Sequence, residues 1–180
     1  MTTVSFPRHL PVACQAACER LRVMPTPQLL VIQVSTQTAA LYENGAYAAQ
    51  YPCSTSRHGV GQTVGSNRTP LGLHCIAEKI GEGLPAGTVF KGRVVVGHTS
   101  DPLFADAKIT TRILWLDGLD PGLNRGGNVD SHARYIYIHG TADQASVGRP
   151  ASSGCTHFTD PVLIHLFELL PSGTHVWIEE

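Results

Sequence analysis

Apolar residues along this chain recur mainly with the spacing of strands. Short apolar or alternating runs, each bounded by Gly, Pro, Asn or Asp, predict many strands and few helices. The expected strands are residues 29–34, 38–42, 47–53, 71–76, 89–96, 109–116, 135–139 and 174–178. Asn44-Gly45 is typical of a hairpin turn, because both residues tolerate positive φ. The pattern predicts a mainly β sandwich or barrel.

Two segments have helical signals. Residues 11–24 lie between two prolines and carry a weak apolar stripe. The stripe consists of Val12, Ala16 and Val23. Asp160-Pro161 opens a second helix, in which the acid is expected to be the N-cap. Residues 119–131 lie between these two helices and contain Pro121, Gly122, Gly126 and Gly127. This composition predicts a long mobile loop, and loops of that length in a compact domain are often functional.

Length and composition indicate one globular domain. The chain has 180 residues, of which 42% are hydrophobic and 15% charged, with a formal net charge of -1. This composition argues against disorder, and no Lys/Arg run suits nucleic acid. We expect residues 1–26 to be an N-terminal extension with a short helix, and residues 27–180 to form the domain. The N-terminal residues lack the apolar run of a signal peptide or membrane span, which favours a cytoplasmic location.

Five cysteines, an odd number without an export signal, favour reduced thiols over a disulfide framework. Cys14 and Cys18 lie four residues apart on the predicted helix, but no second pair follows at zinc-ligand spacing. They are therefore expected to fill space in the core, and no metal or other cofactor is expected. His74, His98 and His132 are interpreted as surface or hydrogen-bonded histidines.

Residues 135–158 contain the candidate chemistry. The strand ending at His139-Gly140 precedes a loop that leads to Ser152-Ser153-Gly154-Cys155. A cysteine nucleophile needs a nearby base, and His139 is the best-placed one. The carbonyl of Gly140 is expected to fix the imidazole tautomer, and the amides of Gly154 and Cys155 to stabilise an oxyanion. Taken alone, this spacing is weak evidence and favours a buried cysteine beside a hydrogen-bonded core histidine.

These motifs resemble the catalytic domain of the L,D-transpeptidases, the YkuD-like family. That family ends a strand in His-Gly and, after a loop, carries Ser/Thr-His-Gly-Cys followed by an apolar residue and Arg. Further matching segments, in the same order along residues 28–180, are 68–72 (RTPLG), 112–116 (RILWL), 134–139 (RYIYIH) and 148–152 (GRPAS). The resemblance implies a β-sandwich with a mixed sheet and one or two short helices. It also implies Cys155 as nucleophile and His139 as base.

Three positions depart from the family pattern. Ser153 stands where histidine is usual, Thr156 where Ile or Val is usual, and His157 where arginine is usual. Ser152, Ser153, Gly154 and His157 are the expected oxyanion or substrate-binding residues. A neutral histidine holds substrate less strongly than arginine, so that affinity or pH optimum is expected to differ.

The resemblance implies peptidoglycan stem peptides (muropeptides) as substrates and carbapenems as covalent inhibitors. Without an export signal, the favoured activity is an L,D-carboxypeptidase of cell-wall recycling, which removes the terminal D-Ala of a tetrapeptide. Residues 119–131 are expected to control access of water or amine to the acyl-enzyme. The alternatives are an L,D-transpeptidase that forms 3-3 crosslinks or exchanges D-amino acids, and a non-catalytic domain that binds peptidoglycan peptides.

Overall fold

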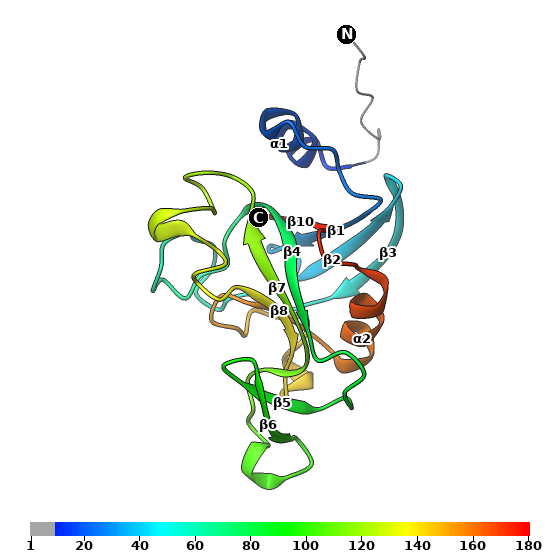
Figure 1. Ribbon diagram of the computed structural model, residues 1–180, viewed down its shortest axis with the longest axis vertical. Coiled ribbons are helices and arrows are strands. Elements are labelled where there is room, and N and C mark those ends of the chain that lie inside the picture. Colours follow the sequence, from blue (N-terminus) through cyan, green and yellow to red (C-terminus); the bar gives the residue numbers. More distant parts are fainter. Residues whose placement is uncertain (1–9) are drawn as a thin grey trace.

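The computed structural model describes residues 10–180, which form a mixed sheet with two helices (Figure 1). The strands are β1 (Gln28–Gln33), β2 (Thr38–Glu43), β3 (Ala46–Pro52), β4 (Gly72–Ile80), β5 (Thr88–Lys91), β6 (Val94–His98), β7 (Thr110–Gly118), β8 (Tyr137–Gly140), β9 (Thr156–Phe158) and β10 (His175–Glu179). The helices are α1 (Val12–Leu21) and α2 (Asp160–Leu169), with short 3-10 helices η1 (Pro102–Phe104), η2 (Gly127–Val129) and η3 (Gln144–Ser146).

The sheet has ten strands and branches at β7. Its main path runs β3-β2-β1-β10-β4-β7-β5-β6, while β8 pairs with β7 and β9 pairs with β8. The β1–β10 and β8–β9 pairs are parallel, and the other pairs are antiparallel. The prediction of a mainly β fold with a mixed sheet and two short helices is confirmed.

Turn chemistry explains both the hairpin that was predicted and the one that was missed. Asn44 and Gly45 have φ of 50° and 80°, as expected for a two-residue turn between β2 and β3. The predicted strand 89–96 is instead a second hairpin, β5–β6. Gly92 and Arg93 form its turn, with φ of 54° and 69°. The apolar residues on both sides concealed this turn in the sequence.

The central strands are buried on both faces, which explains their continuous apolar runs. On β1, Leu30 and Ile32 pack in the main core with α2, whereas Leu29 and Val31 pack in a second cluster with α1. Successive side chains of a strand point to opposite faces of the sheet, so α1 and α2 cover opposite faces at this position.

The predicted apolar stripe of α1 is wrong. Val12 is 82% exposed, and the side chains that face the sheet are Cys14, Ala17 and Cys18. Cysteine behaves as a small hydrophobe in such a position, which confirms the space-filling role expected for this pair. No helix within residues 10–180 has the length and apolar character needed to cross a bilayer.

The second helix begins one residue earlier than predicted, because Asp160 is not its N-cap. Thr159 is the N-cap residue, and Asp160 lies in the first turn without a capping hydrogen bond of its own helix. Its carboxylate instead accepts a hydrogen bond from the Thr111 hydroxyl at 2.5 Å. This contact ties the start of α2 to β7, next to the end of β8.

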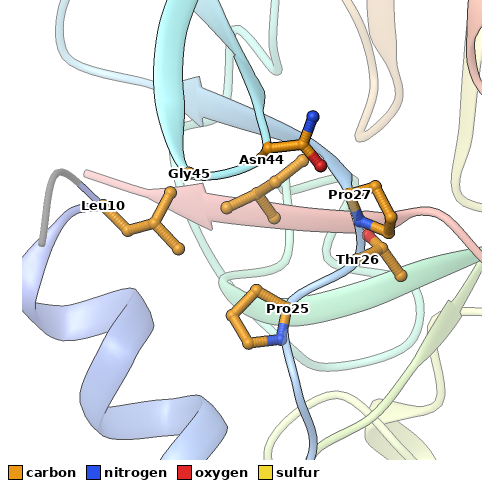
Figure 2. A pocket seen from close by; sticks show the side chains of 7 residues that line it. Leu10, Pro25, Thr26, Pro27, Asn44 and Gly45 are labelled. Atoms are coloured by element: carbon orange, nitrogen blue, oxygen red, sulfur yellow. The ribbon is translucent and has the colours of Figure 1, made fainter. Parts of the chain in front are cut away.

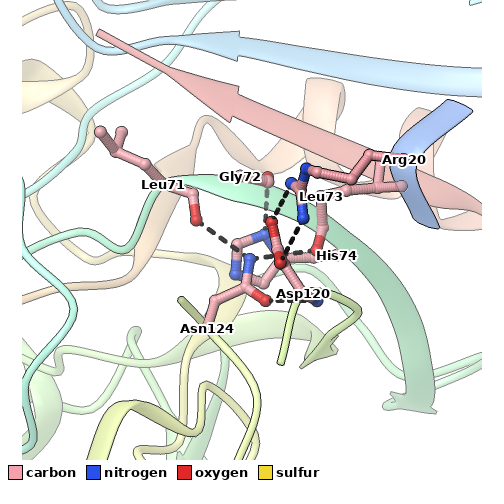
Figure 3. A network of polar contacts seen from close by, with 7 residues as sticks. All are labelled: Arg20, Leu71, Gly72, Leu73, His74, Asp120 and Asn124. Carbon is pink, nitrogen blue, oxygen red and sulfur yellow. Dashed lines mark hydrogen bonds and ion pairs between the residues drawn. The ribbon is translucent and has the colours of Figure 1, made fainter. Parts of the chain in front are cut away.

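Residues 119–131 are held to β4 by buried polar contacts (Figure 3). The Asn124 side-chain amide donates to the carbonyls of Leu71 and Leu73 at 3.0 and 3.1 Å. Arg20 of α1 forms an ion pair with Asp120, and His74 shares a hydrogen bond of 3.0 Å with the Ser131 hydroxyl. The sequence predicted a mobile loop, but these bonds anchor the segment along its length.

His74 makes the free energy of unfolding depend on pH. Burial lowers its pKa to about 4, against 6.5 for the free side chain. Between these values the unfolded chain binds a proton that the folded chain does not, so stability is complete above pH 6.5 and falls as the pH drops toward 4. We expect His74→Gln to flatten the slope by about 1.4 kcal/mol per pH unit near pH 5.

Urea unfolding at several pH values between 4.5 and 7.5 measures this slope. His58→Gln is the matched control, because His58 is exposed. An unchanged slope in His74→Gln would show that His74 is not a source of the pH dependence.

Candidate active site

The parallel pairing of β8 and β9 brings the two candidate catalytic residues together. His139 on β8 is in register with His157 on β9, and their rings lie 4.5 Å apart. Cys155 immediately precedes β9. Because both strands run in the same direction, residues that are 16 positions apart in the sequence, His139 and Cys155, line one cavity.

Backbone groups from the start of β8 surround the Cys155 thiol. The Tyr137 amide donates to Sγ at 3.3 Å, and the thiol donates to the Tyr135 carbonyl at 3.5 Å. Tyr135 has φ of 57°, an uncommon conformation for a bulky residue, which turns the chain into β8. Burial raises the pKa of Cys155 to about 11, although the Tyr137 amide and the Arg134 charge oppose this rise.

His139 is positioned to act as a neutral base. Its side chain is 2% exposed, and Nδ1 lies 2.7 Å from the Gly140 carbonyl oxygen. A carbonyl only accepts hydrogen bonds, so Nδ1 carries the proton and Nε2 has a free lone pair. Burial, followed by the nearby His157, lowers the pKa of His139 to about 3. At neutral pH the resting site therefore contains a thiol and an imidazole rather than an ion pair.

Gly140 and Gly154 both occupy positions that disfavour a side chain, Gly140 through lack of space and Gly154 through its backbone conformation. A Cβ on Gly140 would lie 2.8 Å from the Thr110 hydroxyl and 2.9 Å from the Asp160 carboxylate. Gly154 has φ of 124°, and its carbonyl accepts a hydrogen bond from the Thr69 hydroxyl at 3.0 Å. Both glycines therefore allow close backbone packing around the two catalytic candidates.

The structure changes the predicted roles of Ser152 and Gly154. The Gly154 amide donates to the Ser152 hydroxyl at 3.2 Å, and that hydroxyl donates to the Cys155 carbonyl at 2.6 Å. Ser152 is buried and shapes the turn that presents the nucleophile. The Gly154 amide is thus already engaged, which leaves the Cys155 amide as the candidate oxyanion donor of the predicted pair.

A loop formed by residues 56–70 supports the nucleophile from the other side. Thr69, within the sequence motif RTPLG, is fully buried and also accepts from the Ser56 amide at 3.0 Å. Arg134 holds this loop by donating to the carbonyls of Gln62 and Arg68, each at 2.7 Å. These contacts give the upstream motif a structural role in fixing the Gly154–Cys155 backbone.

Two cavities flank Ser153, which is exposed. The first, of about 250 Å³, is lined by Arg57, Lys108, Ile109, His139, Ala151, Ser152, Ser153, Cys155 and His157. The second, of about 190 Å³, is lined by Val64, Gly65, Asn67, Ala133, Arg134, Tyr135, Ile136 and Ser153. No residue of 119–131 lines either cavity, so that the predicted control of the active site by this segment is not supported.

The histidines His74, His98 and His132, and Arg112 of the matching segment 112–116, do not line these cavities. A separate cavity of about 240 Å³, near the start of β1, has no titratable or nucleophilic side chain in its lining (Figure 2). His98 contacts the Ala86 carbonyl at 2.7 Å, and His132 stacks on Trp115. Arg112 is buried and donates to the Leu84 carbonyl at 2.8 Å. Within residues 10–180, no three His, Cys, Asp or Glu side chains are grouped as metal ligands.

Sequence reasoning missed Arg57 and Lys108 in the catalytic cavity. Both come from segments without a motif, and only the folded chain brings them beside Cys155. It also missed the amide of Tyr137 and the carbonyl of Tyr135, since backbone contacts leave no residue-type signal. The contact between the tilted rings of His157 and His139 follows from the β8–β9 register, which the sequence of such short strands does not reveal.

Comparison with known proteins identifies similar sequences and folds. The family model of the L,D-transpeptidase catalytic domain (YkuD) matches residues 27–178. The putative L,D-transpeptidase YqjB of Bacillus subtilis (strain 168) is 40% identical over 47 residues, covering 26% of this chain and 27% of that protein. The B. subtilis match is thus local.

Two solved structures show the same fold at low sequence identity. An L,D-transpeptidase from Mycobacterium smegmatis superimposes with a TM-score of 0.52 and 15% identity, covering 88% of this chain and 61% of that one. The L,D-transpeptidase LdtMt1 in complex with imipenem gives a TM-score of 0.54 and 16% identity, covering 85% and 59%. This chain therefore spans about three fifths of the length of each.

The protonated state of Cys155 has a measurable consequence for alkylation. Iodoacetamide reacts with the thiolate, and the raised pKa of about 11 predicts that its rate keeps increasing above pH 9. Mass spectrometry of the Cys155 peptide measures this rate, and Cys155→Ala identifies the background from the other four cysteines. A rate that reaches a plateau by pH 7 would instead indicate a preformed thiolate–imidazolium pair.

Proposed function

Because this chain belongs to the L,D-transpeptidase catalytic-domain (YkuD) family, we propose that it is a cysteine L,D-carboxypeptidase that removes the terminal D-Ala from peptidoglycan-derived tetrapeptides. The observation that supports this proposal is the position of Cys155 and His139 on one cavity, with the His139 tautomer fixed by the Gly140 carbonyl. The class of substrate in this proposal is inferred from family membership, and the reaction is inferred from the geometry of Cys155 and His139.

The first half of the reaction forms an acyl-enzyme. As Sγ of Cys155 attacks the carbonyl carbon of the third stem residue, its proton passes to Nε2 of His139. The C–S bond forms, the amide C–N bond breaks, and His139 returns the proton to the departing amine of D-Ala. The Nδ1 hydrogen bond to the Gly140 carbonyl keeps the ring oriented through both transfers.

The second half resolves the thioester. His139 takes a proton from water as the water oxygen attacks the acyl carbon, and the C–S bond breaks to restore the Cys155 thiol. The product is a tripeptide with a new terminal carboxylate. A neutral base is required in both halves, and the low pKa of His139, about 3, keeps it neutral at physiological pH.

Water is favoured as the acceptor because it needs no binding site of its own. An acceptor peptide would need a site beside the acyl-enzyme and a route for its amine to Cys155.

The compartment and the partners form part of the same proposal. A cytoplasmic enzyme would meet soluble stem peptides rather than the assembled cell wall. All five cysteines are free thiols, and Cys14, Cys18 and Cys53 are fully buried, in keeping with a reducing environment. Carbapenems are proposed covalent inhibitors, since a structural relative is known in complex with imipenem.

Transpeptidation is the second candidate function. The observation in its favour is that cavities lie on both sides of Ser153, one for each of two substrates. Both reactions use the same acyl-enzyme, so that they differ only in the acceptor. Non-catalytic peptide binding is the third candidate, based on the departures at Ser153, Thr156 and His157.

Removal of the nucleophile tests catalysis against simple binding. We expect Cys155→Ala to lower the turnover of a muropeptide tetrapeptide by at least about 1,000-fold, because the covalent step is lost. Cys75→Ser is the matched control, since Cys75 is half-buried on β4 and lines neither cavity. Equal turnover by Cys155→Ala and the native chain would exclude this mechanism.

Product analysis separates water from amine acceptors. With tetrapeptide alone and with excess acceptor peptide, we expect tripeptide and free D-Ala to remain the main products by mass spectrometry. The physical reason is that water needs no binding site of its own, whereas an acceptor peptide must first bind beside the acyl-enzyme. If 3-3 crosslinked dimers dominate when acceptor is added, the protein is a transpeptidase.

A further inference from the structure

The catalytic cavity has a positively charged rim. Its lining includes Arg57 and Lys108 but neither Asp nor Glu. The ion pairs found within residues 10–180 are Arg20–Asp120 and His132–Glu78, so neither rim cation is neutralised by an acid there. Arg57 has one side-chain contact, of 3.4 Å, with the neighbouring His58. Both charges are therefore available to a ligand.

The backbone fixes these cations on different walls of the cavity. The Arg57 amide donates to the Ser152 carbonyl at 3.1 Å, which ties Arg57 to the turn that carries Cys155. Lys108 lies between two anchored residues. The Ala107 carbonyl accepts from Ala142 at 3.1 Å, and the Ile109 carbonyl accepts from Phe90 at 3.0 Å. The side chains of Arg57 and Lys108 are exposed and line the cavity, and their backbone positions are fixed by these hydrogen bonds.

His157 is a buried, uncharged side chain that lines the same cavity and contacts the ring of His139. It is 9% exposed, lines the cavity, and its Nδ1 has no hydrogen-bond partner within the described chain. Burial, and then the charge of Lys108, lowers its pKa to about 4. His157 is therefore uncharged at neutral pH, and the positive charges of this cavity are those of Arg57 and Lys108 on its rim.

The second cavity offers no comparable charge. Its one basic residue, Arg134, uses its guanidinium to hold the carbonyls of Gln62 and Arg68. An anionic end of a substrate is consequently attracted to the first cavity. The volume of this first cavity is about 250 Å³.

We propose that Lys108 and Arg57 bind the free α-carboxylate of the residue that leaves, so that the enzyme selects peptides ending one residue beyond the scissile amide. This inference rests on the proposed carboxypeptidase function and defines its substrate class. Longer or carboxamide-terminated peptides lack an anion at the required place.

Peptide binding to Cys155→Ala protein tests the carboxylate site without turnover. The probes are a muropeptide tetrapeptide with a free terminal D-Ala carboxylate and the same peptide ending in D-alaninamide, compared by calorimetry. We expect the acid to bind about tenfold more tightly, because each charge-assisted hydrogen bond to the carboxylate is lost in the amide. Adding Lys108→Gln or Arg57→Gln should weaken binding of the acid and leave binding of the amide unchanged.

Lys91→Gln is the matched control, since it removes the same charge from an exposed lysine that does not line this cavity. In the protein that retains Cys155, the same two rim substitutions should raise KM for the acid by about tenfold with little change in kcat. The alkylation rate of Cys155 by neutral iodoacetamide should stay the same, which shows that the nucleophile is intact.

The outcomes distinguish this inference from the proposed reaction. One outcome is that the native chain cleaves the free-acid peptide and the D-alaninamide peptide equally, with no effect of Lys108→Gln or Arg57→Gln. That result would contradict the proposed carboxylate site and leave the proposed peptidase reaction supported. If neither peptide is cleaved but Cys155→Ala prefers the acid through Lys108 and Arg57, the reaction is wrong while the site stands. Equal binding of both peptides, or no binding of either, would overturn the carboxylate site.

Discussion

The site depends on the parallel pairing of two very short strands, β8 and β9. This register places His139 opposite His157 and brings Cys155 to the Tyr137 amide. Such short strands do not hold a register by themselves, and the surrounding contacts explain how they do so here. β9 is covered on its other side by an antiparallel bridge between Ser54 and His157. The Thr69 hydroxyl fixes the preceding turn through the Gly154 carbonyl.

Burial then sets the chemical state of the pair. Desolvation disfavours both charged forms, which raises the pKa of the thiol and lowers that of the imidazole. In the proposed mechanism, proton transfer therefore accompanies attack on the substrate rather than preceding it. Arg57 and Lys108, which we propose to bind the substrate carboxylate, are exposed side chains of the same cavity, where a cation costs little desolvation. The cavity thus combines uncharged side chains at Cys155 and His139 with charged, exposed side chains at its rim.

The sequence predicted the features that depend on residue type and local spacing. These include the β2–β3 turn at Asn44-Gly45, the second helix, and the His139-Gly140 contact. It failed where tertiary packing decides the outcome. The buried face of α1 depends on which side meets the sheet, and the anchoring of residues 119–131 depends on Asn124 reaching two carbonyls of a distant strand. Nor does any local pattern connect Lys108 with Cys155.

The protonated thiol also determines how Cys155 meets oxidants. Peroxide and disulfides react with thiolates, and a thiol whose pKa is about 11 is almost entirely protonated at pH 7. The half-buried sulfur is consequently protected from sulfenic acid formation and mixed disulfides while the site is empty. In the proposed mechanism, the thiol loses its proton to His139 only as it attacks a bound peptide. The same desolvation that delays ionisation would therefore also protect the proposed nucleophile between catalytic cycles.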